Sequence, residues 1–323
     1  MPDFPIRLIQ AGVLEPGLTQ ALYHSLAERM DASAPDTIVL CQPATPYLCL
    51  GYHQVLDAVL DVPVCQTLNL PIFRRRVGGG ATYLDTNQVF YQCIFHHSRV
   101  PARTDRIYER MLAAPVKLLQ RLGLQGRLRA INEVEAEGLR VAGIGGGRIG
   151  EAMVVVGNLL LDFDYETMGR VWRVPHPAFR KLAVAALHER VTTLRRLGCH
   201  SPSATLQDGL ADTFRESMER PVESGMLSEA EWEHARQNAT LLASPDFLQQ
   251  HRPEGTIPPM RSLKIAAEVF IHAKTILHQG RSLECAVRAE QGTITAVQFQ
   301  EDTSPGLDDL RTQMLGTSVT DWD

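Results

Sequence analysis

The sequence predicts an α+β fold, in which a mixed or mostly antiparallel sheet is flanked by helices. Short apolar runs typical of buried strands occur in groups, and helical patterns separate these groups without a strict strand–helix–strand alternation. Apolar residues make up 44% and charged residues 21% of the 323 residues, which is typical of a folded protein with a substantial core. This length accommodates one large domain and one smaller domain.

The first part of the chain contains two helical patterns and four strand patterns. Apolar residues recur every four positions from Leu18 to Met30, which predicts an amphipathic helix. A second helix is expected from about 105 to 122, with a kink or break at Pro115, because proline cannot donate its main-chain hydrogen bond. Strands are expected at TIVLC (37–41), YLCLG (47–51), PIFRR (71–75) and QVFYQCIF (88–95).

The middle of the chain changes to strands joined by tight turns. The segments 132–138, 139–143 and 151–163 have strand patterns, with turns predicted at Glu137–Gly138 and within Gly145 to Gly150. Helices are then expected near 205–220 and 228–243. Ser228 and Glu231 have the spacing of a capping box at the start of the second of these helices.

A polar segment rich in proline, PDFLQQHRPEGTIPP (245–259), is the best candidate for a linker. We therefore expect a large domain at 1–248, a linker at 249–262 and a small α+β domain at 263–323. Within the small domain we expect a helix, two alternating strands around Gly292, and a last helix at 306–316.

Composition excludes several classes of protein. The net charge of −5 argues against a general nucleic-acid binder. The longest apolar run is interrupted by Asn158 and is too short to span a bilayer, and the first residues do not have the pattern of a signal peptide, so no membrane association and a cytoplasmic location are expected. The six cysteines include no C-x-x-C pair, which argues against a zinc site or a disulfide framework.

The segment RRRVGGGATYLD (74–85) is the strongest candidate for a functional site. Consecutive glycines let a ligand approach the main chain closely, and the exposed N–H groups of such a loop bind phosphate oxygens. Guanidinium groups suit phosphates and carboxylates. The segment is neither a Walker A motif nor a G-x-G-x-x-G fingerprint. It predicts an anion site, with a plain basic turn as the alternative.

The same segment resembles the signature R-R-x-S-G-G-G-x-V-x-H-D of the lipoate–protein ligase family, which is related to biotin–protein ligases and octanoyltransferases. Val77 and Leu84 depart from this signature, at positions where the family usually has Ser or Thr and His. Four further segments resemble segments of the family in the same order along the chain: YLCLGYHQ, INEV, GNLLLDFD and ERVTTL. The tail from about residue 263 also resembles a part of the family's proteins. The likeness thus covers most of the chain.

The resemblance implies a set of site residues and an activity. It implies an acyl pocket that includes Gln54 and Gly143, and a site for ATP and the acyl-adenylate formed by Arg74, Arg75, Gly78, Gly79, Gly80, Ala81, Thr82, Tyr83, Asp85 and Asn132. It also implies a ligase that uses ATP with Mg²⁺ to activate lipoate (lipoic acid) or octanoate. The acyl group would pass to a lysine of a lipoyl-domain acceptor protein, and the tail would be the family's accessory domain.

One departure concerns the catalytic cation. The family motif G-x-K-[IV]-x-G-x-A corresponds here to GLRVAGIG, so Arg140 occupies the lysine position. Arginine keeps the positive charge that holds a phosphate or stabilises an oxyanion, but its planar head needs more room. Arg140 is therefore the predicted catalytic residue, with an ordinary exposed charge on a strand as the alternative. Arg148, in the glycine-rich stretch that follows, is expected at a solvated hairpin tip, or else to swing inward and assist.

Two other functions stay open. An acyltransferase that needs no ATP would require a nucleophilic cysteine, but there is no cysteine between Ile94 and Gly198, and Cys93 and Cys199 have the setting of core or incidental thiols. A catalytically silent binder of lipoate or of a lipoylated partner is the other alternative. No metal site is predicted in the protein, because adjacent residues such as His96 and His97 face opposite ways on a strand.

Overall fold

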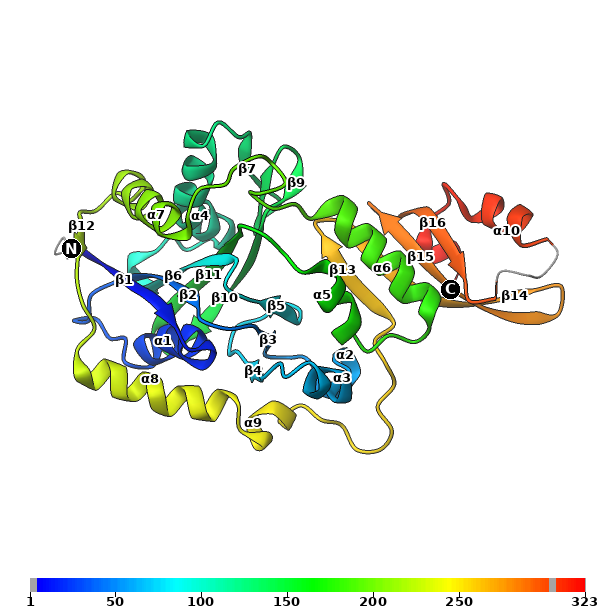
Figure 1. The fold of residues 1–323 in the computed structure, drawn as a ribbon, viewed down its shortest axis with the longest axis horizontal. Coiled ribbons are helices and arrows are strands. Elements are labelled where there is room, and N and C mark those ends of the chain that lie inside the picture. Colours follow the sequence, from blue (N-terminus) through cyan, green and yellow to red (C-terminus); the bar gives the residue numbers. More distant parts are fainter. Residues whose placement is uncertain (1–4, 302–305, 323) are drawn as a thin grey trace. The chain divides into compact units, whose positions relative to one another are not determined.

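A computed structural model describes residues 5–301 and 306–322 (Figure 1). The chain divides into two compact units, and each unit combines segments that are distant in sequence. The larger unit consists of Met1–Gln54, Asn69–Phe163 and Thr192–His251, and the smaller unit of Val55–Leu68, Asp164–Val191 and Arg252–Asp323. The smaller unit therefore contains more of the chain than the tail at 263–323 that the sequence suggested, because two pairs of helices from earlier in the chain belong to it.

A six-stranded sheet forms the centre of the larger unit, in the order β10-β11-β6-β2-β1-β12. Its strands are β1 (Ile6–Leu14), β2 (Thr37–Pro43), β6 (Gln88–His96), β10 (Ala142–Ile149), β11 (Ala152–Leu160) and β12 (Val222–Ser224). Strand β2 pairs parallel to β1 and antiparallel to β6, so the sheet is mixed. The α+β prediction is thus confirmed.

Helices cover both faces of this sheet (Figure 1). Helices α4 (Thr104–Arg121) and α7 (Ser203–Ser217) pack on one face, while α1 (Pro16–Glu28) lies on the other and packs against α8 (Glu229–Leu242). Every residue of β2 and β6 is buried, which explains why both strands have nearly continuous apolar sequences. The two faces of the sheet give separate hydrophobic clusters, one with Tyr91 and Phe214 and one with Phe90 and Leu22.

Two small sheets complete the larger unit, together with the short helix α9 (Pro245–Gln249) and a 3₁₀ turn, η1 (His97–Arg99). One has the order β4-β3-β5 and contains β3 (Tyr47–Leu50), β4 (Ile72–Arg74) and β5 (Thr82–Leu84). The other has the order β7-β8-β9 and contains β7 (Gly126–Arg129), β8 (Glu133–Ala136) and β9 (Leu139–Arg140). Strands β4 and β5 flank β3, and residues 75–81 connect them. These residues are named the glycine loop below.

The smaller unit has a four-stranded antiparallel sheet in the order β13-β14-β15-β16. Its strands are β13 (Ser262–Ala266), β14 (Val269–His278), β15 (Arg281–Glu290) and β16 (Thr293–Phe299). Helix α6 (Pro177–Arg190) contacts all four strands. The remaining elements are α2 (Leu56–Val59), α3 (Val62–Thr67), α5 (Tyr165–Val171), α10 (Leu307–Met314) and η2 (Val319–Trp322).

Most predicted elements are present, but three predictions were wrong. The helix expected at the start of the tail is instead β13 and β14, because buried residues alternate along β14 and a turn with positive φ at Glu268 joins the two strands. Helix α4 continues through Pro115 without a break, since its buried face packs on the sheet. The stretch Gly145 to Gly150 is mostly strand β10, and the turn is at Gly150–Glu151.

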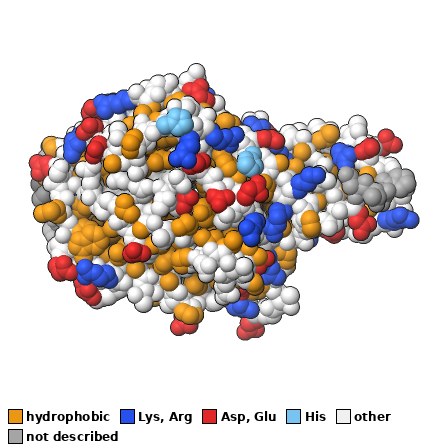
Figure 2. All heavy atoms as spheres, in the orientation of Figure 1, with side chains coloured by type: hydrophobic (Ala, Val, Ile, Leu, Met, Phe, Trp, Pro, Cys, Tyr) orange, Lys and Arg blue, Asp and Glu red, His pale blue; other side chains and the backbone are white. Residues whose placement is uncertain are grey.

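Three local predictions were confirmed. Helix α1 covers the expected periodic segment, helices α7 and α8 form where they were expected, and Ser228 and Glu231 form a complete capping box. Among the described residues, no helix is both long and apolar enough to cross a membrane. On the face shown in Figure 2, acidic and basic side chains are interspersed, consistent with the many ion pairs between exposed side chains.

Candidate functional site

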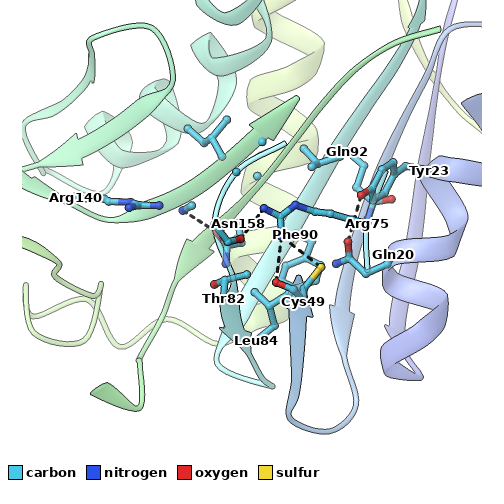
Figure 3. A pocket seen from close by; sticks show the side chains of 17 residues that line it. Gln20, Tyr23, Cys49, Arg75, Thr82, Leu84, Phe90, Gln92, Arg140 and Asn158 are labelled. Atoms are coloured by element: carbon cyan, nitrogen blue, oxygen red, sulfur yellow. Dashed lines mark hydrogen bonds between the residues drawn. The ribbon is translucent and has the colours of Figure 1, made fainter. Parts of the chain in front are cut away.

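A pocket of about 120 Å³ lies in the larger unit (Figure 3). Its lining comes from α1, β3, the glycine loop, β5, β6, β9, β10 and β11. Leu84, Phe90, Ile144 and Val156 supply apolar surface. The remaining lining residues are small or polar: Gln20, Tyr23, Cys49, Arg75, Gly79, Gly80, Thr82, Gln92, Arg140, Gly143, Gly145, Gly157 and Asn158.

Arg75 lines this pocket and shapes the glycine loop from within. Its Nε and Nη2 atoms donate to the carbonyl oxygen of Gly78 at 3.2 and 2.9 Å, and Nη2 donates to that of Gly80 at 2.8 Å. Its Nη1 atom donates to the carbonyl of Cys49 at 3.2 Å and contacts the Cys49 Sγ at 3.6 Å. These contacts use all five N–H donors of the guanidinium. Arg75 therefore fixes the shape of the loop and has no unpaired N–H donor to offer to a ligand.

Two glycines are required by this packing. Gly79 has φ +102°, and a Cβ there would lie 2.7 Å from the Nη2 atom of Arg75. A Cβ on Gly51 would lie only 1.9 Å from the carbonyl oxygen of Gly79. In contrast, a Cβ on Gly78 or Gly80 would meet nothing within 4 Å. One of these two required glycines, Gly51, thus lies outside the loop, directly after β3.

Arg74 is fully buried but points away from the pocket. Its Nη1 atom donates to the carbonyl oxygens of Gly51, Tyr52 and Gln54 at 3.2, 2.6 and 2.7 Å, and its Nη2 atom donates to that of Leu248. Burial lowers the pKa of Arg74 from its usual value. Arg74 thus stabilises the turn that follows β3, which places it behind the site rather than in it.

The partners of Arg74 and Arg75 are all neutral: among the described residues, neither guanidinium has a carboxylate within ion-pair distance. Arg76 differs, because it forms an ion pair with Glu28 and lies over the ring of Phe247. Two buried positive charges without a carboxylate partner make the region under the loop electropositive and favour an anion nearby. This arrangement supports the anion site predicted from the sequence over a plain turn.

His24 anchors the start of the loop from α1. Its ring is fully buried, its Nε2 atom accepts a hydrogen bond from the main-chain N–H of Arg76, and its Nδ1 atom lies 2.7 Å from the carbonyl oxygen of Gln20. These contacts fit a neutral ring with its proton on Nδ1. Burial, together with the charges of Arg76 and Arg75, lowers the pKa of His24 to about 3.

Asn158 organises the opposite wall. Its Oδ1 atom accepts a hydrogen bond of 2.7 Å from the main-chain N–H of Gly143, and its Nδ2 atom donates to Gln88. Gln88 in turn donates to the carbonyl of Tyr83 at 3.2 Å. A Cβ on Gly143 would lie 2.9 Å from Oδ1, so a glycine is needed at this position. The network ties β5, β6, β10 and β11 together around the pocket.

Arg140 reaches the pocket from β9, and its Nε atom donates to the carbonyl of Ala142 at 3.0 Å. Burial lowers the pKa of its guanidinium, and the negative charge of Glu133 opposes this shift. An arginine remains protonated in such a setting. In Figure 3 the guanidinium of Arg140 lies on the opposite side of the pocket from Tyr23 and Gln20.

The predicted site residues are therefore only partly brought together. The pocket is lined by Arg75, Gly79, Gly80, Thr82, Arg140 and Gly143. Outside its lining lie Arg74, Gly78, Ala81, Tyr83, Asp85, Asn132 and Gln54. Asp85 accepts hydrogen bonds from the main chain and side chain of Asn87, and so fixes the turn after β5. Gln54 accepts from the N–H of Gly51. Asn132 lies in the turn between β7 and β8.

Five polar lining residues were missed from the sequence: Gln20, Tyr23, Cys49, Gln92 and Asn158. Two of them carried a usable signal. Asn158 interrupts an apolar strand, and Gln92 lies on the same face of β6 as Phe90. Cys49 is buried, which raises the pKa of its thiol, although the nearby charge of Arg75 opposes this. A neutral thiol is a weak nucleophile.

The prediction that His96 and His97 face opposite ways was wrong. Strand β6 ends at His96 and a 3₁₀ turn begins at His97, so their ring centroids lie 4.5 Å apart. Nε2 of His96 and Nδ1 of His97 lie 3.9 and 3.1 Å from Oε2 of Glu151. Arg148 pairs with the same carboxylate at 3.2 Å and is exposed near the hairpin tip. These contacts tie the end of β6 to the β10–β11 turn.

The chain is similar to curated proteins of lipoate metabolism. It is 21% identical over 264 residues to "Probable lipoate-protein ligase A" of Mycoplasma pneumoniae, covering 79% of this chain and 70% of that protein. It is 26% identical over 228 residues to "Octanoyltransferase LipM" of Kyrpidia tusciae, covering 63% of this chain and 83% of the other.

Solved structures share the fold. A bi-partite lipoate protein ligase from Thermoplasma acidophilum, described with its E2 lipoyl domain, superimposes with a TM-score of 0.70 at 18% identity, over 79% of this chain and all of the other. A lipoate-protein ligase A bound with ATP gives a TM-score of 0.65 at 17% identity, over 77% of this chain and all of the other.

The family model for the lipoyl protein ligase A/B catalytic domain matches residues 15–215. This range contains the glycine loop, Arg140, Asn158 and every residue that lines the pocket. The chain belongs to the lipoyl protein ligase A/B catalytic domain family.

Proposed function

We propose that this chain is an ATP-dependent lipoate–protein ligase. It activates lipoate or octanoate as an acyl-adenylate and transfers the acyl group to a lysine of a lipoyl carrier domain. The observation that carries the proposal is the convergence, in one pocket, of an electropositive glycine loop, the Arg140 guanidinium and an apolar wall. Relatives named lipoate-protein ligase support it, as does the fold shared with a ligase bound with ATP.

The loop geometry suits the phosphate of an adenylate. Arg75 holds the carbonyls of Gly78 and Gly80 toward itself. Because the C=O and N–H of a trans peptide point in opposite directions, the N–H groups of Gly79 and Ala81 point away from Arg75. Such N–H groups are free to donate to phosphate oxygens. Arg74 and Arg75 supply positive charge behind the loop.

In the first step, a carboxylate oxygen of the acid attacks the α-phosphorus of ATP and pyrophosphate leaves. In the second, the neutral amine of the acceptor lysine attacks the acyl carbonyl. The bond to AMP then breaks, and the nitrogen loses a proton to give the amide. Arg140 neutralises the phosphate and stabilises the oxyanion on the carbonyl. The apolar wall keeps water from the mixed anhydride.

Mg²⁺ enters the proposal as the companion of ATP. No aspartate or glutamate is among the described residues that line the pocket. Since Mg²⁺ in proteins is held by carboxylates and substrate phosphates, the phosphate oxygens and water are its expected ligands here. The lining itself does not fit a dedicated Mg²⁺ site.

Two observations favour a second function: several relatives are named octanoyltransferase, and Cys49 lines the pocket. An ATP-independent transferase would pass the acyl group from one carrier to another.

The test is lipoate-dependent exchange of labelled pyrophosphate into ATP, followed by transfer to a lipoyl domain and to a control domain whose acceptor lysine is replaced by arginine. We expect exchange, and transfer only to the domain with the lysine. Transfer from an octanoylated carrier without ATP and without exchange would indicate the transferase. Binding of lipoate with neither reaction would indicate a silent binder.

A further inference from the structure

One end of the pocket is polar, although a medium-chain acyl group is apolar. Gln20 and Tyr23 from α1 and Gln92 from β6 gather there, on the opposite side of the pocket from Arg140 (Figure 3). All three are buried, and the exposed fraction of Gln92 is 2%. Burying polar groups against an alkyl chain is unfavourable unless they are hydrogen-bonded.

The side-chain amide of Gln92 has one hydrogen-bonded atom and one unpaired acceptor. Its Nε2 atom donates to the carbonyl oxygen of Thr19 on α1. Its Oε1 atom is buried and has no hydrogen-bond partner among the described residues. Turning the amide over would place two oxygens face to face, so the Thr19 carbonyl fixes Oε1 in its present orientation.

Tyr23 provides a second acceptor beside it. Its hydroxyl donates to the Oε1 of Gln20 at 3.3 Å, and the Nε2 of Gln20 donates to the hydroxyl of Tyr47 at 2.7 Å. These contacts use the hydroxyl proton of Tyr23 and leave its oxygen able to accept a hydrogen bond. The polar end therefore offers acceptors, and the ligand group that matches acceptors is a donor.

We propose that, among the medium-chain carboxylic acids it accepts, the site binds most tightly those with a hydrogen-bond donor (O–H, N–H or S–H) at the end opposite the carboxyl group. This inference rests on the proposed function for its orientation, with the carboxyl end near Arg140 and the far end near Gln92. A hydroxylated chain and the reduced, dithiol form of lipoate both carry such a donor. A plain alkyl chain and the cyclic disulfide do not.

Binding to the 323-residue chain without ATP, measured by calorimetry, tests the inference independently of catalysis. The probes are matched pairs: hexanoate with 6-hydroxyhexanoate, octanoate with 8-hydroxyoctanoate or 8-mercaptooctanoate, and lipoate with its reduced form. We expect the donor-bearing member of at least one pair to bind about ten-fold to hundred-fold more tightly, because the plain chain leaves a buried acceptor unpaired. The pair with the largest difference identifies the donor and the chain length.

The variants Gln92→Leu and Tyr23→Phe locate the effect, with Gln207→Leu, a buried glutamine on α7 that does not line the pocket, as the control. Gln92→Leu should abolish or reverse the preference, Tyr23→Phe should reduce it, and the control should keep it. Equal binding within every pair, or a preference unchanged by Gln92→Leu, would overturn the inference. A preference without ATP–pyrophosphate exchange would leave it standing and remove the proposed ligase function instead.

Discussion

The Nε2 atom of His24 accepts a hydrogen bond of 2.8 Å from the main-chain N–H of Arg76. A side chain from α1 thereby holds the glycine loop at its start, 52 residues further along the chain. The bond requires an unprotonated Nε2, and the burial that lowers the pKa of His24 to about 3 keeps this nitrogen unprotonated at neutral pH. The geometry of the loop is therefore linked to pH.

The first prediction follows from this linkage. Above pH 6.5 His24 is neutral in both the folded and the unfolded state. As the pH falls below 6.5, only the unfolded state gains the proton until the pH approaches the folded value of about 3. The free energy of unfolding should therefore fall by about 1.4 kcal/mol per pH unit in this window because of His24. Urea titrations at several pH values between 7 and 5 measure this change in the free energy of unfolding. His24→Gln should flatten the dependence, and the exposed control His200→Gln should leave it unchanged.

A second prediction compares two adjacent glycines. Gly79→Ala should lower the free energy of unfolding by about 1–3 kcal/mol and abolish most activity, because the backbone at φ +102° is strained for alanine and the new Cβ meets Arg75. Gly78→Ala should change stability by less than about 1 kcal/mol, since nothing lies within 4 Å of its Cβ. Thermal unfolding and pyrophosphate exchange measure both variants. Equal damage by the two substitutions would contradict the role assigned to Arg75 in shaping the loop.

The third prediction concerns Arg140. Arg140→Ala should lower the rate of acyl-adenylate formation by about 10²-fold, the usual loss when one charged stabiliser of a transition state is removed. Arg140→Lys should retain activity because it keeps the charge. Arg148→Ala is the matched control, since Arg148 is exposed near the hairpin tip and does not line the pocket. An active Arg140→Ala variant would place the catalytic cation at another residue.

The fourth prediction separates the two candidate reactions at Cys49. For a ligase that uses an adenylate, Cys49→Ala should change exchange and transfer by less than about ten-fold, because the thiol contributes only a weak contact to Arg75. Mass spectrometry of the wild-type chain after incubation with an octanoylated carrier provides the second measurement. A thioester on Cys49, together with loss of transfer in the alanine variant, would instead identify a transferase.

Local patterns were enough to predict much of the fold. The four-residue spacing before Met30, the capping box at Ser228 and the alternating strands around Gly292 depend on neighbouring residues, and all three are present. The prediction of a helix after the linker was wrong, because pairing between strands β13 and β14 overrides the local preference for a helix. Pairing between strands depends on residues that are distant in sequence, which a local pattern does not contain.

The sequence by itself determined the family and the mixed α+β fold, and it predicted an anion-binding loop, because these depend on residue types in a fixed local order. Only the tertiary structure decided which of two adjacent arginines faces the pocket. Arg74 and Arg75 are neighbours, yet one binds the turn after β3 and the other binds the loop. The structure also decided that Gln92, Tyr23 and Cys49 share the pocket with Arg140, because α1, β3, β6 and β9 are distant in sequence and meet only when the larger unit folds.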